Sequence, residues 1–302
     1  MNFPLMRSLG KSSGLLVISP CTILSSLHCM RQVFKLLIER QDSVWWYKLN
    51  GVIRRAIALG VLNPIAEPVV LTEYPKSGGS WMSQMLSAAL NIPYTRNRLP
   101  TSGSQIIHGC FLKVNRNIDT VVVWRDGRDT MISYYYHMMF DKPITSAIAG
   151  DSVRRKLGVR DPYDVDANLP RFIEWACTGG YPRFTWGDFI NNWYDRSGVV
   201  YTSYEACLAD PFLELKTILS AFNRCNHTDE QLKNVIEQHT FESQSNRKPG
   251  EEDVKSFIRK GIVGDWKNTF NREACEIFIE HCGKELILLG YAEDDSWIDY
   301  KS

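Results

Sequence analysis

Apolar, β-branched runs alternate with helix-like segments from Val69 almost to the end of the chain. Four short runs have the composition of buried strands, at Val69–Tyr74, Ile106–Phe111, Thr120–Arg125 and Val199–Ser203. Helical patterns are predicted at Ser80–Leu90, Asp129–Phe140, Trp186–Tyr194, Pro211–Phe222, Asp229–Gln238 and Arg272–Leu289. This alternation predicts an α/β fold, with a mostly parallel central sheet flanked by helices.

Two regions depart from this alternation. Residues 1–45 hold a weakly apolar stretch, which falls short of the roughly 20 apolar residues that a membrane-spanning helix needs. We expect a peripheral or flexible N-terminal extension, with contact to a membrane surface as an open alternative. Residues 46–302 contain no repeat or low-complexity linker, which predicts a single domain.

The second departure lies around residues 141–185, which are rich in Gly, Pro, Asp and Arg and lack clear periodicity. Loops and short helices are expected here. A long insertion in a compact domain favours a lid or a substrate-binding element.

Composition narrows the class of protein. With 44% hydrophobic and 23% charged residues, the 302-residue chain is typical of a folded globular protein. A net charge of +1 argues against a nucleic-acid partner, because phosphate backbones require a basic excess. Eight cysteines without a Cys-x-x-Cys pair indicate reduced thiols in a cytoplasmic protein, and argue against a cysteine metal site.

The segment Tyr74-Pro75-Lys76-Ser77-Gly78-Gly79-Ser80-Trp81 follows the first predicted strand and precedes a helix. Its two glycines allow backbone N–H groups to turn toward an anion, while Lys76 adds a positive charge. Ser77 and Ser80 add hydroxyl donors. An ordinary strand–turn–helix corner with a solvated lysine is the alternative. The lysine precedes the glycines, which is the wrong order for the phosphate loop of a nucleoside triphosphatase or kinase.

Two later segments have similar chemistry. Arg125 ends a predicted strand, and Ser133 follows in a helix that we expect Asp129 to cap. The run Arg259-Lys260-Gly261 combines forked donors, a point charge and close backbone access. The alternatives are that Arg125 pairs with a neighbouring aspartate and that the 259–261 run is a solvated loop. Three such segments predict a ligand with more than one phosphate or sulfate group.

These three segments resemble, in sequence and in order, the cofactor-binding motifs of the cytosolic-type sulfotransferases, from about Val69 to the C-terminus. The resemblance implies transfer of a sulfuryl group from 3′-phosphoadenosine 5′-phosphosulfate (PAPS) to a hydroxyl or amine, without a metal. It assigns the 5′-phosphosulfate to Lys76, Ser77, Gly78, Gly79 and Ser80. It assigns the 3′-phosphate to Arg125, Ser133, Arg259, Lys260 and Gly261, and the adenine to Trp81, Tyr204 and Phe241.

The resemblance also implies two catalytic residues, His108 as the base and Lys76 at the leaving group. Histidine is the natural base near neutral pH. Ile106 stands where the family often has a lysine. Three alternatives stay open for the positive charge that this lysine would provide. Lys76 supplies it, or Lys113 approaches from the other side, or the enzyme is slow or altered. Gly79 likewise stands at a position where the family frequently has a threonine.

The acceptor is left as a small molecule, a lipid or a carbohydrate. Aromatic residues of the variable region are expected to line its pocket, namely Tyr163, Phe172, Trp175, Tyr181, Phe184 and Trp186. A homodimer stays an open alternative. Two other functions also stay open: a non-catalytic protein that binds a 3′-phosphoadenosine nucleotide, and a P-loop kinase or nucleoside triphosphatase.

Overall fold

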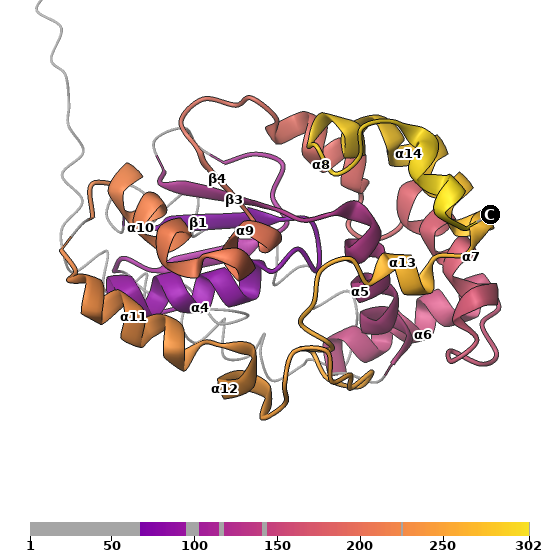
Figure 1. The fold of residues 1–302 in the computed structure, drawn as a ribbon, viewed down its shortest axis with the longest axis horizontal. Coiled ribbons are helices and arrows are strands. Elements are labelled where there is room, and N and C mark those ends of the chain that lie inside the picture. Colours follow the sequence, from indigo (N-terminus) through magenta and orange to yellow (C-terminus); the bar gives the residue numbers. More distant parts are fainter. Residues whose placement is uncertain (1–66, 95–102, 115–117, 141–143, 225, 302) are drawn as a thin grey trace, which may run out of the picture. The chain divides into compact units, whose positions relative to one another are not determined.

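The computed structural model describes residues 67–94, 103–114, 118–140, 144–224 and 226–301, all of which belong to one compact unit, Gly51–Ser302 (Figure 1). The predicted extension, residues 1–45, lies outside the described residues. Within the described ranges, no helix has both the length and the apolar character needed to cross a bilayer. The described cysteines are free thiols.

Four parallel strands form the central sheet of the described chain. They are β1 (Val69–Glu73), β2 (Ile106–Gly109), β3 (Thr120–Trp124) and β4 (Val200–Ser203), in the order β2-β1-β3-β4. Every residue of β1 is buried, because helices cover both faces of the sheet, and this explains its continuous apolar run. The predicted strands are confirmed, although three of them end one or two residues early.

Helices cover each face of the sheet (Figure 1). Val69, Leu71 and Val123 face one layer, and Val70, Ile107 and Val122 face the other. The first layer contains α4 (Gly79–Leu90), α9 (Tyr204–Ala209), α10 (Pro211–Ala221) and α11 (Asp229–Gln238). The second contains α5 (Gly127–Met139), α7 (Val165–Cys177), α8 (Trp186–Trp193) and α14 (Arg272–Leu288). The other helical elements of the described ranges are α6 (Ile144–Leu157), α12 (Phe241–Ser245), α13 (Trp266–Thr269) and the 3₁₀ helix Asp295–Lys301.

Two regular helices, α6 and α7, replace the loops and short helices expected around residues 141–185. Gly150 lies inside α6, where it allows that helix to pack closely on the Met138 carbonyl of α5. A Cβ at this position would clash with that carbonyl. Pro170 lies inside α7 and cannot donate to the carbonyl of Asp166. Asn271 Nδ2 donates to that carbonyl instead, at 2.8 Å. Both helix breakers are therefore compensated by tertiary contacts, which local periodicity does not show.

Helix α5 begins earlier than expected, at Gly127. Its N-cap is Asp126, whose carboxylate accepts from the backbone N–H of Arg128, so the predicted cap at Asp129 is wrong. Asp126 also forms a buried ion pair with the Arg128 guanidinium at 2.8 Å. That guanidinium lies over the Trp266 and Trp297 rings, at 3.8 and 4.7 Å from their centroids. The buried charge is thus paired with a carboxylate and packed between aromatic rings.

We expect Arg128→Ala to lower the free energy of unfolding by about 3–5 kcal/mol, because it leaves the Asp126 carboxylate buried without its ion-pair partner. Urea titration followed by tryptophan fluorescence measures the loss. Arg272→Ala is the matched control, since it removes a guanidinium from an exposed pair with Glu276. Little change is expected there. Equal losses in the two variants would contradict a stabilising role for the buried pair.

Candidate active site

The predicted site residues gather where the parallel strands end at one edge of the sheet. Lys76 lies in the loop after β1, His108 lies in β2, Arg125 directly follows β3, and Tyr204 directly follows β4. Open parallel sheets bind their ligands at this edge. The fold therefore brings together four residues that lie far apart in the sequence.

Glu73, the last residue of β1, is buried and forms a hydrogen bond to the backbone of the glycine loop. Its Oε2 accepts from the backbone N–H of Gly79 at 2.6 Å, and its Oε1 lies 2.8 Å from Nε2 of His108. Burial alone would raise the pKa of the Glu73 carboxyl, but the His108 hydrogen bond and charge, the Gly79 N–H and the Lys76 charge together lower it. Glu73 is therefore ionised at neutral pH. Sequence reasoning missed this residue, although a carboxylate that ends a fully buried strand is an unusual signal.

His108 is half-buried and has a partner at each ring nitrogen. Nε2 faces Glu73, and Nδ1 lies 2.9 Å from the hydroxyl of Tyr94. Three positions bear on which residue supplies a positive charge near His108. Ile106 is fully buried and Lys113 is exposed, whereas Lys76 lies near enough to lower the pKa of the Glu73 carboxyl.

The loop residues after β1 are arranged around aromatic rings. Lys76 Nζ donates to the Phe257 carbonyl at 3.3 Å and lies 3.7 Å from the centroid of that residue's ring. Gly78 has a φ of +97°, and the ring of Tyr204 packs so closely on it that a Cβ would come within 2.7 Å. The rings of Trp81 and Tyr204 are 6.0 Å apart. Ser77 is 1% exposed.

Arg125 turns toward this loop and away from its aspartate neighbour. Its Nη1 donates to the Lys76 carbonyl at 3.0 Å, and its guanidinium lies 4.1 Å from the centroid of the Tyr204 ring. Asp126 pairs with Arg128 instead, so the alternative Arg125–Asp126 pair is wrong. Arg125 therefore links the first two predicted anion-binding segments.

The third segment is tied down by carboxylates and is not a solvated loop. Asp265 accepts from Arg259 Nη2 and from Lys260 Nζ, both at 2.6 Å, and Arg259 also pairs with Glu252. Burial would raise the pKa of the Asp265 carboxyl, but the hydrogen bonds from Lys260 and Arg259 lower it. The Arg259 guanidinium lies 4.6 Å from the centroid of the Tyr136 ring. Arg259 is therefore a rigid, charge-paired group.

Asp129 joins this third segment to α5, because its carboxylate accepts from the backbone N–H groups of Gly264 and Trp266, at 2.6 and 2.9 Å. Phe241 packs directly against Gly261, where a Cβ would clash. These contacts place Phe241 and the Arg259 segment together.

Ser133 lies half-buried on α5, three residues before Tyr136, whose ring contacts Arg259.

Each of the three segments contains a buried donor that has no hydrogen-bond partner among the described residues. These atoms are Ser77 Oγ, Arg125 Nε and Arg259 Nε. Buried polar groups without a partner are uncommon in folded proteins. Donors of this kind suit the oxygen atoms of an anionic ligand such as PAPS.

The aromatic residues that were expected to line one acceptor pocket do not gather around one cavity. Phe172 and Trp186 are 0% exposed and belong to the core, whereas Tyr163 and Tyr181 are 61% and 50% exposed. Tyr134 and Tyr135 are core residues too. The prediction of a single aromatic pocket from this region is wrong, because α7 and α8 turn part of it into the core.

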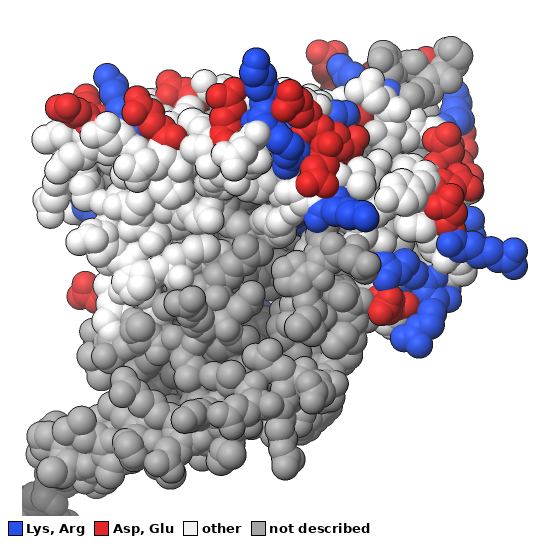
Figure 2. All heavy atoms as spheres, turned by 90° about the horizontal axis from the view of Figure 1, so that it is seen from below, with Lys and Arg blue, Asp and Glu red and all other residues white. Residues whose placement is uncertain are grey.

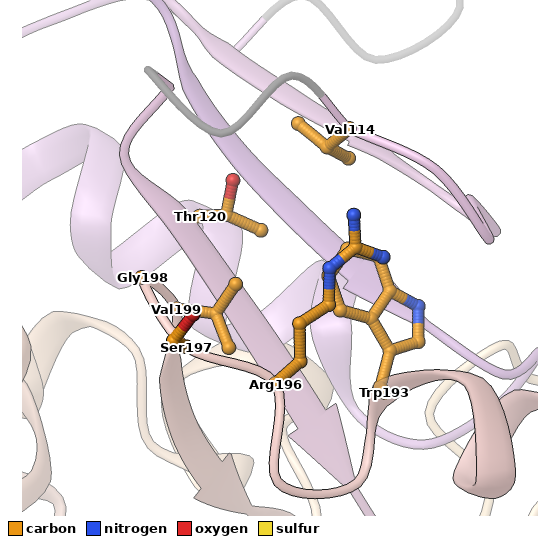
Figure 3. Close-up of a pocket in the computed structure, with 7 residues that line it drawn as sticks. All are labelled: Val114, Thr120, Trp193, Arg196, Ser197, Gly198 and Val199. Atoms are coloured by element: carbon orange, nitrogen blue, oxygen red, sulfur yellow. The ribbon is translucent and has the colours of Figure 1, made fainter.

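Two hollows lie outside the glycine loop. The small one, with a volume of about 10 Å³, lies where β3 and β4 begin (Figure 3). Arg196 stacks on Trp193 there, 4.4 Å from the centroid of its ring, and the space holds no more than one water.

Figure 2 shows acidic and basic side chains intermixed over the described part of one face, with a group of Lys and Arg at the right-hand edge.

The larger hollow, of about 870 Å³, lies between the end of α5, α6 and the segment 158–163. Met139, Phe140 and Tyr163 give it apolar walls. Its described lining residues include four basic ones and one acidic one. The basic residues are Arg154, Arg155, Arg160 and Lys255, and the acidic residue is Asp151.

Comparison with known proteins assigns the family. The chain belongs to the sulfotransferase-domain family, whose model matches residues 108–290, more than half of the chain. Mouse sulfotransferase 1E1 is 24% identical over 83% of this chain and 90% of its own length. Bovine sulfotransferase 1A1 is 22% identical over 76% and 88%. The family model begins at His108, so the glycine loop around Lys76 precedes the matched residues.

Solved structures agree with the fold. Mouse sulfotransferase SULT7A1, complexed with PAP, superposes with a TM-score of 0.55 at 17% identity, covering 80% of this chain and 93% of that one. Retinol dehydratase, in complex with androsterone and the inactive cofactor PAP, gives 0.55 at 16% identity, with coverage of 78% and 84%. The fold and the family together make this chain a PAPS-dependent sulfotransferase domain. Its family excludes the alternative of a P-loop kinase.

Proposed function

We propose that this domain transfers a sulfuryl group from PAPS to a hydroxyl or amine of a small acceptor, with His108 as the general base and Lys76 at the leaving group. The observation that carries the proposal is that the buried donors without a partner among the described residues include Ser77 Oγ, Arg125 Nε and Arg259 Nε, which come from the three anion-binding segments. Each of them can donate to an oxygen atom of an anionic ligand.

The proposed binding roles follow the contacts. Ser77, Gly78, Gly79 and Ser80 hold the 5′-phosphosulfate together with Lys76. The 3′-phosphate is held by Arg125, Ser133, Arg259, Lys260 and Gly261. The adenine is held by Trp81, Tyr204 and Phe241. Two observations support these groups: Tyr204 packs on Gly78 and under Arg125, and Phe241 packs on Gly261.

The proposed chemistry needs a stabilised leaving group and a base. Bound PAPS supplies an activated sulfuryl group on a phosphate. The Lys76 ammonium makes a long hydrogen bond to the Phe257 carbonyl, at 3.3 Å, which a phosphate oxygen outcompetes because it is charged. His108 accepts the proton of the acceptor. Positioned charges account for most of the rate in transfers of this type.

The acceptor side is proposed to be the larger hollow, so that the region around 141–185 serves as the acceptor-binding element. Its volume, about 870 Å³, falls within the range of small-molecule sites. The hollow reaches Lys255, two residues before Phe257, and Phe257 contacts both Lys76 and His137. Apolar walls with basic side chains favour a small acceptor that has an apolar body and a negative group.

His108→Ala is expected to lower kcat by about 10²-fold or more, because general base catalysis is lost, while PAP binding stays nearly unchanged. Transfer of labelled sulfuryl to a panel of hydroxyl and amine acceptors measures kcat, and calorimetry measures PAP binding. His281→Ala, on α14 and paired with Glu174, is the control. Retained turnover would remove His108 from the mechanism. PAP binding by the wild-type protein without transfer to any acceptor would favour the non-catalytic alternative.

Arg259→Ala is expected to weaken PAP binding by about 10- to 100-fold, because hydrogen bonds to a charged group are lost. Binding of the analogue without the 3′-phosphate changes little. Lys248→Ala, an exposed cation nearby in the sequence, is the control and leaves both affinities unchanged. Equal losses for the two nucleotides would place Arg259 away from the 3′-phosphate.

Arg160→Glu tests the acceptor site. It reverses one charge in the larger hollow, so we expect KM for anionic acceptors to rise about fivefold or more, with kcat and neutral acceptors little affected. Lys233→Glu, an exposed residue of α11 on the opposite layer, is the control. A KM that rises equally for neutral and anionic acceptors would contradict an acceptor site with charge selectivity.

A further inference from the structure

A buried carboxylate lies between the nucleotide loop and the proposed base. Glu73 is 5% exposed, and each of its oxygens has a separate partner. Oε2 accepts from the Gly79 N–H at 2.6 Å, on the loop side, and Oε1 lies 2.8 Å from His108 Nε2, on the β2 side. The carboxylate therefore has a fixed orientation, set by the loop backbone.

The charge of Glu73 decides where the His108 proton lies. The charged and polar groups that face the carboxylate among the described residues are His108, Lys76 and the Gly79 N–H. With His108 neutral, its hydrogen bond, the Gly79 N–H and the Lys76 charge still lower the pKa of the buried Glu73 carboxyl. An ionised carboxylate only accepts hydrogen bonds, so Nε2 must carry a proton. In neutral His108, Nδ1 then holds the lone pair and accepts from the Tyr94 hydroxyl at 2.9 Å.

Gly79 makes this arrangement possible. A Cβ at position 79 would come within 2.7 Å of Glu73 Cδ and of Leu71 Cδ2. A larger residue would therefore push the carboxylate off the loop N–H. Glu73 and Gly79 form a matched pair: the missing side chain of one provides the space for the carboxylate of the other.

From these contacts we infer that Glu73 is a positioning residue for sulfuryl transfer, which fixes the Nε2–H tautomer of His108 so that Nδ1 takes the acceptor proton. The inference rests on the proposed role of His108 as the base. For this step the acceptor hydroxyl must replace the Tyr94 hydroxyl as the hydrogen-bond partner of Nδ1.

The proton and electron balance is complete with the groups named. The acceptor oxygen forms its bond to sulfur as its proton passes to Nδ1. The bond from sulfur to the phosphate oxygen breaks, and the electron pair leaves with the phosphate beside Lys76. His108 becomes an imidazolium, which the Glu73 carboxylate stabilises.

Glu73→Gln tests this inference, because it keeps the side-chain shape and removes the charge. In the wild-type protein, ¹⁵N NMR of the histidine ring is expected to show the Nε2–H tautomer of His108, with the signal assigned by its loss in His108→Ala. In Glu73→Gln the Nδ1–H tautomer is expected to grow, because a Gln N–H₂ group donates to Nε2. We expect kcat to fall about tenfold or more, with PAP affinity within threefold.

Glu214→Gln is the matched control. This half-buried glutamate lies on α10 and accepts from Thr202 Oγ1 at 2.6 Å, away from His108. We expect the His108 tautomer and kcat to stay unchanged in this variant.

Two outcomes would overturn the inference. In the first, Glu73→Gln keeps kcat within twofold and leaves the tautomer unchanged. In the second, PAP affinity rises tenfold or more while kcat is retained, which would make Glu73 a competitor of the ligand for the Gly79 N–H. Full turnover in His108→Ala would instead refute the base itself, and the NMR measurement distinguishes that failure, because it requires no turnover.

Gly79→Ala provides a second route that leaves residue 73 intact. Its methyl group is expected to displace the Glu73 carboxylate, and so to lower kcat about tenfold and disturb the tautomer. In a Glu73→Gln background the same change is expected to lower kcat by less than threefold, since positioning is already lost. Independent, multiplicative losses in the double variant would contradict the matched pair.

Discussion

The parallel direction of the strands is the constraint on which the site depends. Because β1, β2, β3 and β4 all run the same way, their carboxyl ends meet at one edge, and residues from four separate segments are brought together there. The register sets the finer geometry. Leu71 of β1 lies opposite both His108 of β2 and Val121 of β3, so a histidine on β2 lies beside the end of β1, where Glu73 can reach it.

A second property of the site is that the two cations of its third segment, Arg259 and Lys260, already have negative partners. Asp265 and Glu252 pair with Arg259, and Asp265 also pairs with Lys260. These pairs hold the cations in fixed positions before a ligand arrives. If these residues bind an anion as proposed, the direction of their donors selects it more than an excess of positive charge, which agrees with a chain of net charge +1.

The sheet could be predicted from the sequence because its central strands β1 and β3 are buried almost throughout and appear as β-branched apolar runs. The glycine loop, His108 and Arg125 could be found for a related reason, since each lies at or just beyond a recognisable strand. The residues that orient them could not be found in this way. Glu73, Tyr94 and Asp129 act through contacts that only the folded chain creates.

The helices α6 and α7 were missed on similar grounds. Gly150 and Pro170 are helix breakers by local preference, yet one allows close packing and the other is compensated by Asn271. A pattern confined to neighbouring residues contains neither fact. The same limit explains why the aromatic residues of this region were expected to line a pocket, when several of them are core residues.

The contacts that close the site also join distant parts of the chain. Trp81 Nε1 donates to the His239 carbonyl 158 residues away, Lys76 Nζ to the Phe257 carbonyl 181 residues away, and Gly264 N to the Asp129 carboxylate 135 residues away. Contacts of such long range form only after large loops have closed. A partly folded chain, or one cut between Trp81 and His239, therefore lacks the complete site even if its sheet has formed. Ligand binding therefore also reports whether the described unit has folded completely.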